Sequence, residues 1–319
     1  MRRFRAGLAL AAVLFCPIAR AQNALPLDPA TPPVIVPAGP PADARVTIAV
    51  AIGGKGPWNF IVDTGAQRTV IARDLAQQLA LPPGVPVTVI SMTGRTDTPT
   101  VALPRLSFGT DGIDDIEAPV LEGRDIGAAG LLGLDGLHAK RLLLDFRTGR
   151  MEISDSGPRM AVDRDTIVVQ ARRRKGQLIL LGSQVNGMKV DIMLDTGTNI
   201  SVGNLALMRK LQTKGLLPGL EPASLTSVTG GSLAGPAGII AAIRLGPVTL
   251  KGVPVMFADV SPFAHLGLRG RPALLLGIDA LRLFDRVAID FGRGKVDFLL
   301  PDTGALDPLR FAQALPVRG

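Results

Sequence analysis

The sequence predicts an all-β protein made of two similar halves, with a few short helices. A short apolar strand ending in Asp-Thr-Gly occurs twice, as N-F-I-V-D-T-G-A over residues 59–66 and D-I-M-L-D-T-G-T over residues 191–198. Each copy is followed by a second similar segment, at residues 130–135 and 274–279. The 37 glycines and 26 prolines among 319 residues favour many turns and short strands over long helices.

Residues 1–21 have the features of a cleaved signal peptide. Arg2, Arg3 and Arg5 precede a short apolar stretch, and A-R-A at residues 19–21 offers a cleavage site. Ten apolar residues are too few to span a bilayer, so no stable membrane insertion is expected after cleavage. The predicted localisation is therefore periplasmic or secreted.

Cleavage would also change the charge and the redox chemistry of the chain. The segment carries four arginines and no acid, so the formal net charge falls from +8 to +4. The only cysteine, Cys16, leaves with it, so the mature chain has no disulfide. A charge of +4 does not indicate nucleic-acid binding, and the basic run at residues 172–175, which has no interleaved aromatic residue, is interpreted as a solvated loop.

The rest of the chain divides by composition and by repeat. Residues 22–44 contain seven prolines and are expected to form an arm or linker. The predicted units are an N-terminal lobe at 45–155, a linker at 156–176, a C-terminal lobe at 177–301 and a tail at 302–319. A third Asp-Thr-Gly, at 302–304, has no second signature after it and is interpreted as a turn leaving the last strand.

Each lobe is expected to begin with a β-hairpin. In the first, V-T-I-A-V-A-I runs from Val46 to a glycine-rich turn, and W-N-F-I-V then leads to Asp63. In the second, Asn186-Gly187 separates two apolar runs, which is a strong hairpin signal, and the second run leads to Asp195. Both halves thus place an acid at the end of the second strand.

The two halves also match further along the chain. G-L-L-G-L-D at 130–135 corresponds to L-L-L-G-I-D at 274–279, and each is followed by a short helical stretch and a closing hairpin. The stretch from Asp195 to Gly277 in the second half is longer than the stretch from Asp63 to Gly133 in the first. This difference predicts an insertion in the second half, around residues 261–271. The repeat therefore predicts a pseudo-twofold molecule.

These four ordered segments resemble the signature of aspartic proteases. The form Asp63-Thr64-Gly65-Ala66 is similar to the retropepsin-like group, and two copies in one chain resemble the two-lobed plan of pepsin. The resemblance covers residues from about 45 to 300. It implies two retropepsin-like acid-protease barrel lobes related by pseudo-twofold symmetry, with the activity of an aspartic endopeptidase on polypeptide substrates. It implies no cofactor, no metal ion and a monomer that forms an internal pseudo-dimer.

The resemblance also assigns roles to residues. Asp63 and Asp195 would hold one water between them and share a proton, as paired carboxyl groups in aspartic proteases do. The residues expected to support this dyad are Thr64, Gly65, Ala66, Thr196, Gly197, Thr198, Gly133 and Gly277. Two mobile hairpins, or flaps, would cover the substrate, with tips at Met92, Thr93, Gly94, Arg95 and at Thr229, Gly230, Gly231, Ser232.

Two finer expectations concern polar side chains near the dyad. Thr198 is expected to donate a hydrogen bond to Asp195, whereas Ala66 offers none to Asp63, so Asp195 would carry the negative charge more of the time. Asp135 and Asp279 are interpreted as helix N-caps.

Other activities were weighed against this one. His138 and His265 are the only histidines, so no multi-histidine zinc site is expected, and no G-x-S-x-G segment supports a serine hydrolase. A two-lobed protein that binds peptides, or acts as a scaffold, without cleaving them is the main alternative. A zymogen in which residues 22–44 cover the cleft is a further one.

Overall fold

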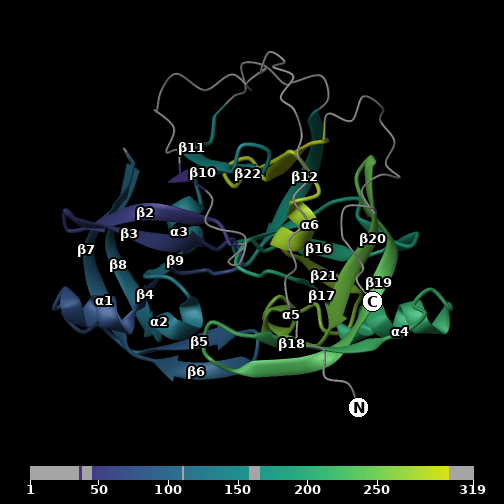
Figure 1. The fold of residues 1–319 in the computed structure, drawn as a ribbon, viewed down its shortest axis with the longest axis horizontal. Coiled ribbons are helices and arrows are strands. Elements are labelled where there is room, and N and C mark those ends of the chain that lie inside the picture. The colour runs from purple at the N-terminus through teal and green to yellow at the C-terminus, as the bar shows by residue number, and fades with distance from the viewer. Residues whose placement is uncertain (1–35, 38–44, 110, 158–165, 302–319) are drawn as a thin grey trace, which may run out of the picture.

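The two lobes lie side by side, joined by a shared sheet, in the computed structural model of the chain (Figure 1). It describes residues 36–37, 45–109, 111–157 and 166–301. These residues are mostly in strands, with a few short helices. The predicted signal peptide, most of the Pro-rich arm, and the tail with the third Asp-Thr-Gly lie outside the described residues.

The N-terminal lobe is a closed barrel in the order β2-β3-β9-β4-β8-β7. Strands β3 and β9 are parallel, as are β4 and β8, while β9 and β4 are antiparallel. Strand β2 alternates between buried and more exposed residues, as a strand with one face on the core should. The barrel strands are β2 Thr47–Ile52, β3 Lys55–Val62, β4 Val70–Ala72, β7 Thr100–Phe108, β8 Asp111–Leu121 and β9 Gly130–Leu132.

Three helices and a separate hairpin complete this lobe. The hairpin pairs β5 Val87–Ser91 with β6 Gly94–Thr98 and lies apart from the barrel sheet. The helices are α1 Arg73–Gln78, α2 Gly123–Ile126 and α3 Leu134–Leu137. In Figure 1 the hairpin lies at the bottom of the molecule and reaches toward the second lobe.

The C-terminal lobe repeats the strand order of the first, as β13-β16-β21-β17-β20-β19. The parallel pairs β16–β21 and β17–β20 match those of the first lobe. Strand β19 also pairs with β14, which follows β13 closely along the chain, so the sheet curves back to its beginning. The fold is therefore two barrel lobes, as the sequence predicted.

The elements of this lobe differ in length from those of the first. The strands are β13 Gln177–Leu180, β14 Gln184–Val185, β15 Met188–Lys189, β16 Asp191–Leu194, β17 Ser201–Gly203, β18 Glu221–Thr226, β19 Ser232–Leu245, β20 Val248–Phe257 and β21 Ala273–Leu276. The helices are α4 Leu205–Thr213, α5 Ser261–His265 and α6 Ile278–Leu281. Asn186 and Gly187 both have positive φ in the turn between β14 and β15, as the predicted Asn-Gly hairpin requires.

A sheet shared by both lobes joins them. Its order is β1-β11-β10-β22-β23-β12, so the closing hairpins of the two halves pair with each other through β10 and β22. Across that pair, Arg286 donates a hydrogen bond from Nε to Asp145 at 2.8 Å, with both side chains largely buried. The strands are β1 Val36–Pro37, β10 Lys140–Asp145, β11 Arg150–Asp155, β12 Thr166–Arg174, β22 Arg286–Asp290 and β23 Lys295–Leu299.

Strand β12 occupies part of the segment expected to be a linker. It pairs first with β23 and then with β13, so it connects the shared sheet to the second barrel. The basic run expected to be a loop is the end of this strand, and only Lys175 lies in the turn that follows. The composition of this segment did not indicate a strand, because most of its side chains are partly or fully exposed. Backbone pairing with β23 and β13 is what makes it a strand.

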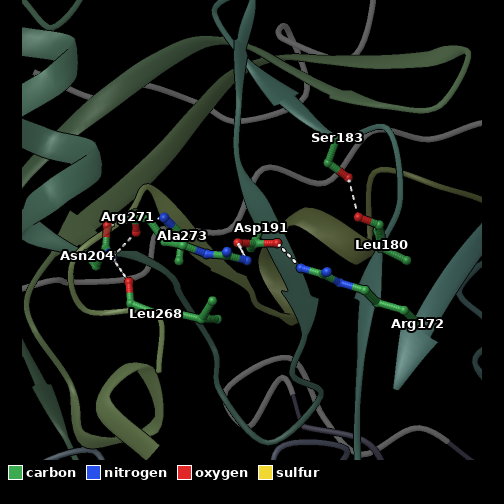
Figure 2. A network of polar contacts seen from close by, with 8 residues as sticks. All are labelled: Arg172, Leu180, Ser183, Asp191, Asn204, Leu268, Arg271 and Ala273. Atoms are coloured by element: carbon green, nitrogen blue, oxygen red, sulfur yellow. Dashed lines mark hydrogen bonds and ion pairs between the residues drawn. The ribbon is translucent and has the colours of Figure 1, made fainter. Parts of the chain in front are cut away.

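The connection between β20 and β21 carries α5 and is longer than its counterpart in the first lobe, where the sequence predicted an insertion. The buried side chain of Asn204 holds this connection. Its Nδ2 donates to the carbonyl oxygens of Leu268 at 2.9 Å and Arg271 at 2.7 Å, and its Oδ1 accepts from the amides of Leu207 and Ala273. Figure 2 shows Asn204 between Leu268, Arg271 and Ala273, with Asp191 between Arg172 and Arg271 nearby.

One hydrophobic cluster extends through both barrels and the shared sheet, and a second packs α5 against the second barrel. Within the part of the chain that is described, no helix combines the length and the apolar character needed to cross a bilayer.

We expect Asn204→Ala to lower the free energy of unfolding by about 2–4 kcal/mol, because several buried backbone groups lose their partner together. Urea unfolding of the purified protein measures this. Asn199→Ala, which truncates an exposed asparagine, is the matched control and should change stability little. Equal stability of the two variants would show that Asn204 does not hold the connection.

Candidate active site

Asp63 and Asp195 lie at the ends of equivalent strands and meet between the lobes. Asp63 follows β3 and donates its amide to the carbonyl of Leu132, while Asp195 follows β16 and donates to Leu276, both at 3.0 Å. The parallel partners β9 and β21 thus fix where each acid leaves its sheet. Both residues are buried, with 8% and 5% of their surface exposed.

Reciprocal hydrogen bonds between the two threonines lock the acid loops together. The Thr64 amide donates to Oγ1 of Thr196 at 3.1 Å, and the Thr196 amide donates to Oγ1 of Thr64 at the same distance. Each hydroxyl donates onward to a backbone carbonyl of the opposite lobe, Thr64 to Leu194 at 3.1 Å and Thr196 to Val62 at 2.6 Å. Both side chains are fully buried, so these bonds do not compete with water.

The glycines of the two loops allow each aspartate to approach the opposite loop. A Cβ on Gly65 would lie 2.5 Å from Oδ2 of Asp195, and one on Gly197 would lie 2.3 Å from Cγ of Asp63. No alanine fits at such distances. The two carboxyl groups therefore lie against each other's loops only because both residues are glycine.

Backbone amides of its own loop stabilise the charge of each carboxyl group. Burial raises the pKa of both. Asp63 accepts hydrogen bonds at Oδ1 from the amides of Gly65 at 2.8 Å and Ala66 at 3.0 Å, which favour its ionised form. The pKa of Asp195 is raised well above the usual range by burial and then by the negative charge of Asp63. Asp195 in turn accepts from the amide of Gly197 at 3.0 Å. Because two adjacent negative charges are costly in this buried place, the pair retains one proton more readily than a lone carboxyl group would.

The hydroxyl of Thr198 does not have the expected role. It donates to the carbonyl of Ile200 at 3.1 Å, not to the carboxylate of Asp195. The expected extra stabilisation of charge on Asp195 by this hydroxyl is therefore wrong. The residue type at this position could not show that the hydroxyl bends back to its own loop.

Gly133 and Gly277 leave room for the backbone that follows each acid loop. A Cβ on Gly133 would lie 2.5 Å from the carbonyl carbon of Arg68, and one on Gly277 would lie 2.7 Å from that of Ile200. The second Leu-Gly segment of each lobe thus packs directly behind its acid loop, and a larger residue would displace it.

Asp135 and Asp279 brace these loops and are not helix N-caps. Asp135 accepts from the amide of Thr69 at 2.8 Å and from its hydroxyl at 2.7 Å, and Asp279 accepts from Ser201 in the same way at 3.1 and 2.9 Å. The N-cap positions of α3 and α6 are glycines. Residue type suggested a cap, but the partner of Asp135 lies just before β4 and that of Asp279 lies in β17, both far along the chain.

A cleft of about 710 Å³ lies in front of the two acids, a size typical of ligand-binding sites. It is lined mainly by apolar residues of both lobes and by the hairpin β5–β6 and strand β18. Met92 to Arg95 form the tip of the first hairpin, and Thr229 to Ser232 lie at the tip between β18 and β19. The tips meet, because the hydroxyl of Thr229 donates to that of Ser91 at 3.0 Å.

A family model described as aspartyl protease matches residues 48–135 and 182–280, more than half of the chain. The chain belongs to the aspartyl protease family. Each matched range contains one Asp-Thr-Gly and one of the glycine-containing segments behind it, so the family match has the same twofold arrangement as the structure. No curated protein matches the chain.

Several residues of this site were not found from the sequence. Thr69 and Ser201 lie at equal distances after their aspartates, so an alignment of the two halves would have paired them. Gln177 gave no such signal, yet its Nε2 donates to the carbonyl of Gly65 at 2.8 Å and fixes the first acid loop from the other lobe. At one end of the cleft, the side-chain amide of Gln67 donates to the backbone carbonyl of Lys175. The ammonium group of Lys175 donates in turn to the backbone carbonyl of His265.

The described residues contain no cluster of three or more His, Cys, Asp or Glu side chains that suits a metal ion.

We expect Thr64→Val to lower the free energy of unfolding by about 2–4 kcal/mol, because the carbonyl of Leu194 and the amide of Thr196 lose their buried partner. Chemical denaturation measures this. Thr64→Ser keeps the hydroxyl and should retain most of the stability. A valine variant as stable as the serine variant would show that the hydroxyl bonds do not hold the loops.

We expect Asp195→Asn to stabilise the protein at neutral pH but not in acid. A carboxyl group with a raised folded pKa favours folding below the unfolded value of about 3.8, and this contribution is lost as the pH rises through the folded pKa. The asparagine amide has no such proton to lose, so the variant keeps the stability that the parent loses. Its free energy of unfolding should exceed that of the parent by ~1.4 kcal/mol for each pH unit that separates the folded from the unfolded pKa of Asp195.

Urea unfolding of both proteins from pH 3 to pH 7 measures the difference. Asp74→Asn, at an exposed aspartate of α1, is the control for removing one charge. A stability difference that does not grow with pH would contradict the raised pKa of Asp195.

Proposed function

We propose that the protein is an aspartic endopeptidase that hydrolyses peptide bonds with a water molecule activated between Asp63 and Asp195. The observation that carries this proposal is the placement of two buried carboxyl groups, each against the loop of the other, at the base of a large cleft. Membership of the aspartyl protease family supports it. One charged and one protonated carboxyl group are the base and the acid that peptide hydrolysis needs.

The chemistry follows from this division of roles. The carboxylate of Asp63 takes a proton from the water molecule while the oxygen of that water bonds to the scissile carbonyl carbon. At the same time Asp195 gives its proton to the carbonyl oxygen. The resulting tetrahedral diol then breaks its C–N bond as a proton passes from Asp63 to the leaving nitrogen, and a diol hydroxyl returns a proton to Asp195. Neither aspartate forms a covalent bond to the substrate. The dyad ends in its starting state, with one proton.

The hairpin tips would act as flaps in this reaction. They lie over the cleft and touch each other through Ser91 and Thr229, so a polypeptide can enter only when they separate or when it threads between them and the acids. Closed flaps would exclude water from the dyad and strengthen its electrostatic interactions. Apolar side chains on both sides of the acids suit an extended polypeptide substrate.

The organisation of the chain suggests where and in what form it works. Both halves of the dyad come from one chain, so we propose that a monomer is active. On the basis of residues 1–21, we propose export to the periplasm or secretion.

We expect Asp63→Asn and Asp195→Asn each to lower kcat for peptide cleavage by ~10²–10⁴-fold or more, since each removes the proton acceptor or the proton donor. A diverse peptide library at pH 3 to pH 7, read by mass spectrometry, measures cleavage. Asp74→Asn should cleave like the parent. A parent that binds library peptides but never cuts them would instead favour the peptide-binding alternative. Asn variants that both cleave as fast as the parent would exclude the dyad.

A further inference from the structure

Arg45 and Gln177 occupy equivalent positions of the two lobes. Thr47 of β2 pairs with Ile61, and Arg45 lies two residues before Thr47. Ile179 of β13 pairs with Met193, and Gln177 lies two residues before Ile179. Ile61 and Met193 each precede their own catalytic candidate by two residues. The two lobes therefore present an arginine and a glutamine at the same place beside the cleft.

The two side chains are used differently. Gln177 is buried, and its amide donates to the carbonyl of Gly65, so it belongs to the support of the acid loop. Arg45 is only partly buried and lines the cleft, and its Nε is buried with no hydrogen-bond partner among the described residues. A Cβ on Gly127 would lie 2.5 Å from Nη2 of Arg45, so the glycine after α2 leaves the space that the guanidinium fills.

The cleft is electrically asymmetric as a result. On the side of the N-terminal lobe its lining includes Arg45, Arg68 and Arg124, against one acid besides the dyad, Asp125, which lies 3.8 Å from Arg124. On the side of the C-terminal lobe the only other ionisable residue among the described lining residues is His265. Burial, Lys175 and Arg95 lower the pKa of His265, which keeps it neutral near neutral pH.

A buried guanidinium N–H without an acceptor is costly, and a carboxylate is the acceptor that satisfies it best. An arginine fork binds both oxygens of a carboxylate, whereas an ammonium acts as a single point charge. The carboxylates of the dyad are already held by backbone amides of their own loops. None of the described residues supplies that acceptor, and the carboxylate of a substrate side chain in the cleft would do so.

We propose that Arg45 makes the cleft select polypeptides that carry a glutamate or aspartate side chain on the N-terminal-lobe side of the scissile bond. The proposal rests on the proposed peptidase function and specifies its substrate class. An acidic side chain there would accept from the guanidinium, while the other lobe, whose lining mixes apolar and uncharged polar side chains beside His265, would take an uncharged residue.

Arg45 could instead act only as a counter-ion of Asp63, since its charge lowers the pKa of that carboxyl group. The two roles have different signatures. A counter-ion changes the cleavage of all peptides alike and moves the acid limb of the pH profile. A substrate-binding residue changes the ratio between an acidic peptide and its neutral isostere.

The test compares pairs of fluorogenic peptides, built on a sequence cleaved in the library, with Glu or Gln at each position in turn on both sides of the scissile bond. At about pH 5.5, where glutamate is ionised, kcat/KM should favour Glu about tenfold or more at one position. Arg45→Gln, which makes the two lobes identical at this place, should abolish that preference. Arg209→Gln removes the same charge from the exposed surface of α4 and should keep it.

Binding of the same peptide pairs to Asp195→Asn separates this proposal from the peptidase function. That variant resembles the protonated state of Asp195 and leaves Asp63 and Arg45 in place, so it should bind the Glu peptide more tightly than the Gln peptide even without cleavage. If the parent cleaves nothing in the library, the pairs are built on a library peptide that binds, and a Glu preference in binding would then remove the peptidase function but keep the Arg45 site. Equal handling of Glu and Gln at every position, or a preference that survives Arg45→Gln, would overturn the proposal.

Discussion

The reciprocal hydrogen bonds between Thr64 and Thr196 are the constraint on which the rest of the molecule depends. They join two loops from different lobes in a fully buried setting, where no water competes for the same groups. Each hydroxyl also satisfies a carbonyl of the opposite strand, so the lobes cannot separate at this point without leaving polar groups unpaired. The shared sheet through β10 and β22 adds a second junction, far along the chain from the first.

Holding the loops together forces two carboxyl groups into one buried place. Two negative charges are costly there, so burial raises the pKa of both carboxyl groups and the charge of Asp63 raises that of Asp195 further. The fold gives up stability at neutral pH to keep this arrangement. Such a concession is typical of sites whose residues are placed for chemistry rather than for packing.

The differences between the lobes are as informative as the repeat. Symmetric parts of the site, such as the pair Thr69 and Ser201 with their aspartates, maintain the loops. Asymmetric parts lie around the cleft, where Arg45 has the position in its lobe that Gln177 has in the other, and where α5 and its long connection add His265 to the lining. A single chain with two lobes can diverge in this way, whereas identical subunits would have to share every change.

The sequence alone determined the repeat, the barrel class, the two acids and the glycines around them. These follow from local patterns: strand periodicity, turn chemistry and motif order, each readable over a few residues. Tertiary structure decided what depends on partners far along the chain. The hydroxyl of Thr198 turned to Ile200, Asp135 and Asp279 reached distant hydroxyls instead of capping helices, and residues 166–174 became a strand by pairing with β23 and β13. A residue type states which bonds a side chain is able to make, but only the folded chain decides which partner lies within reach.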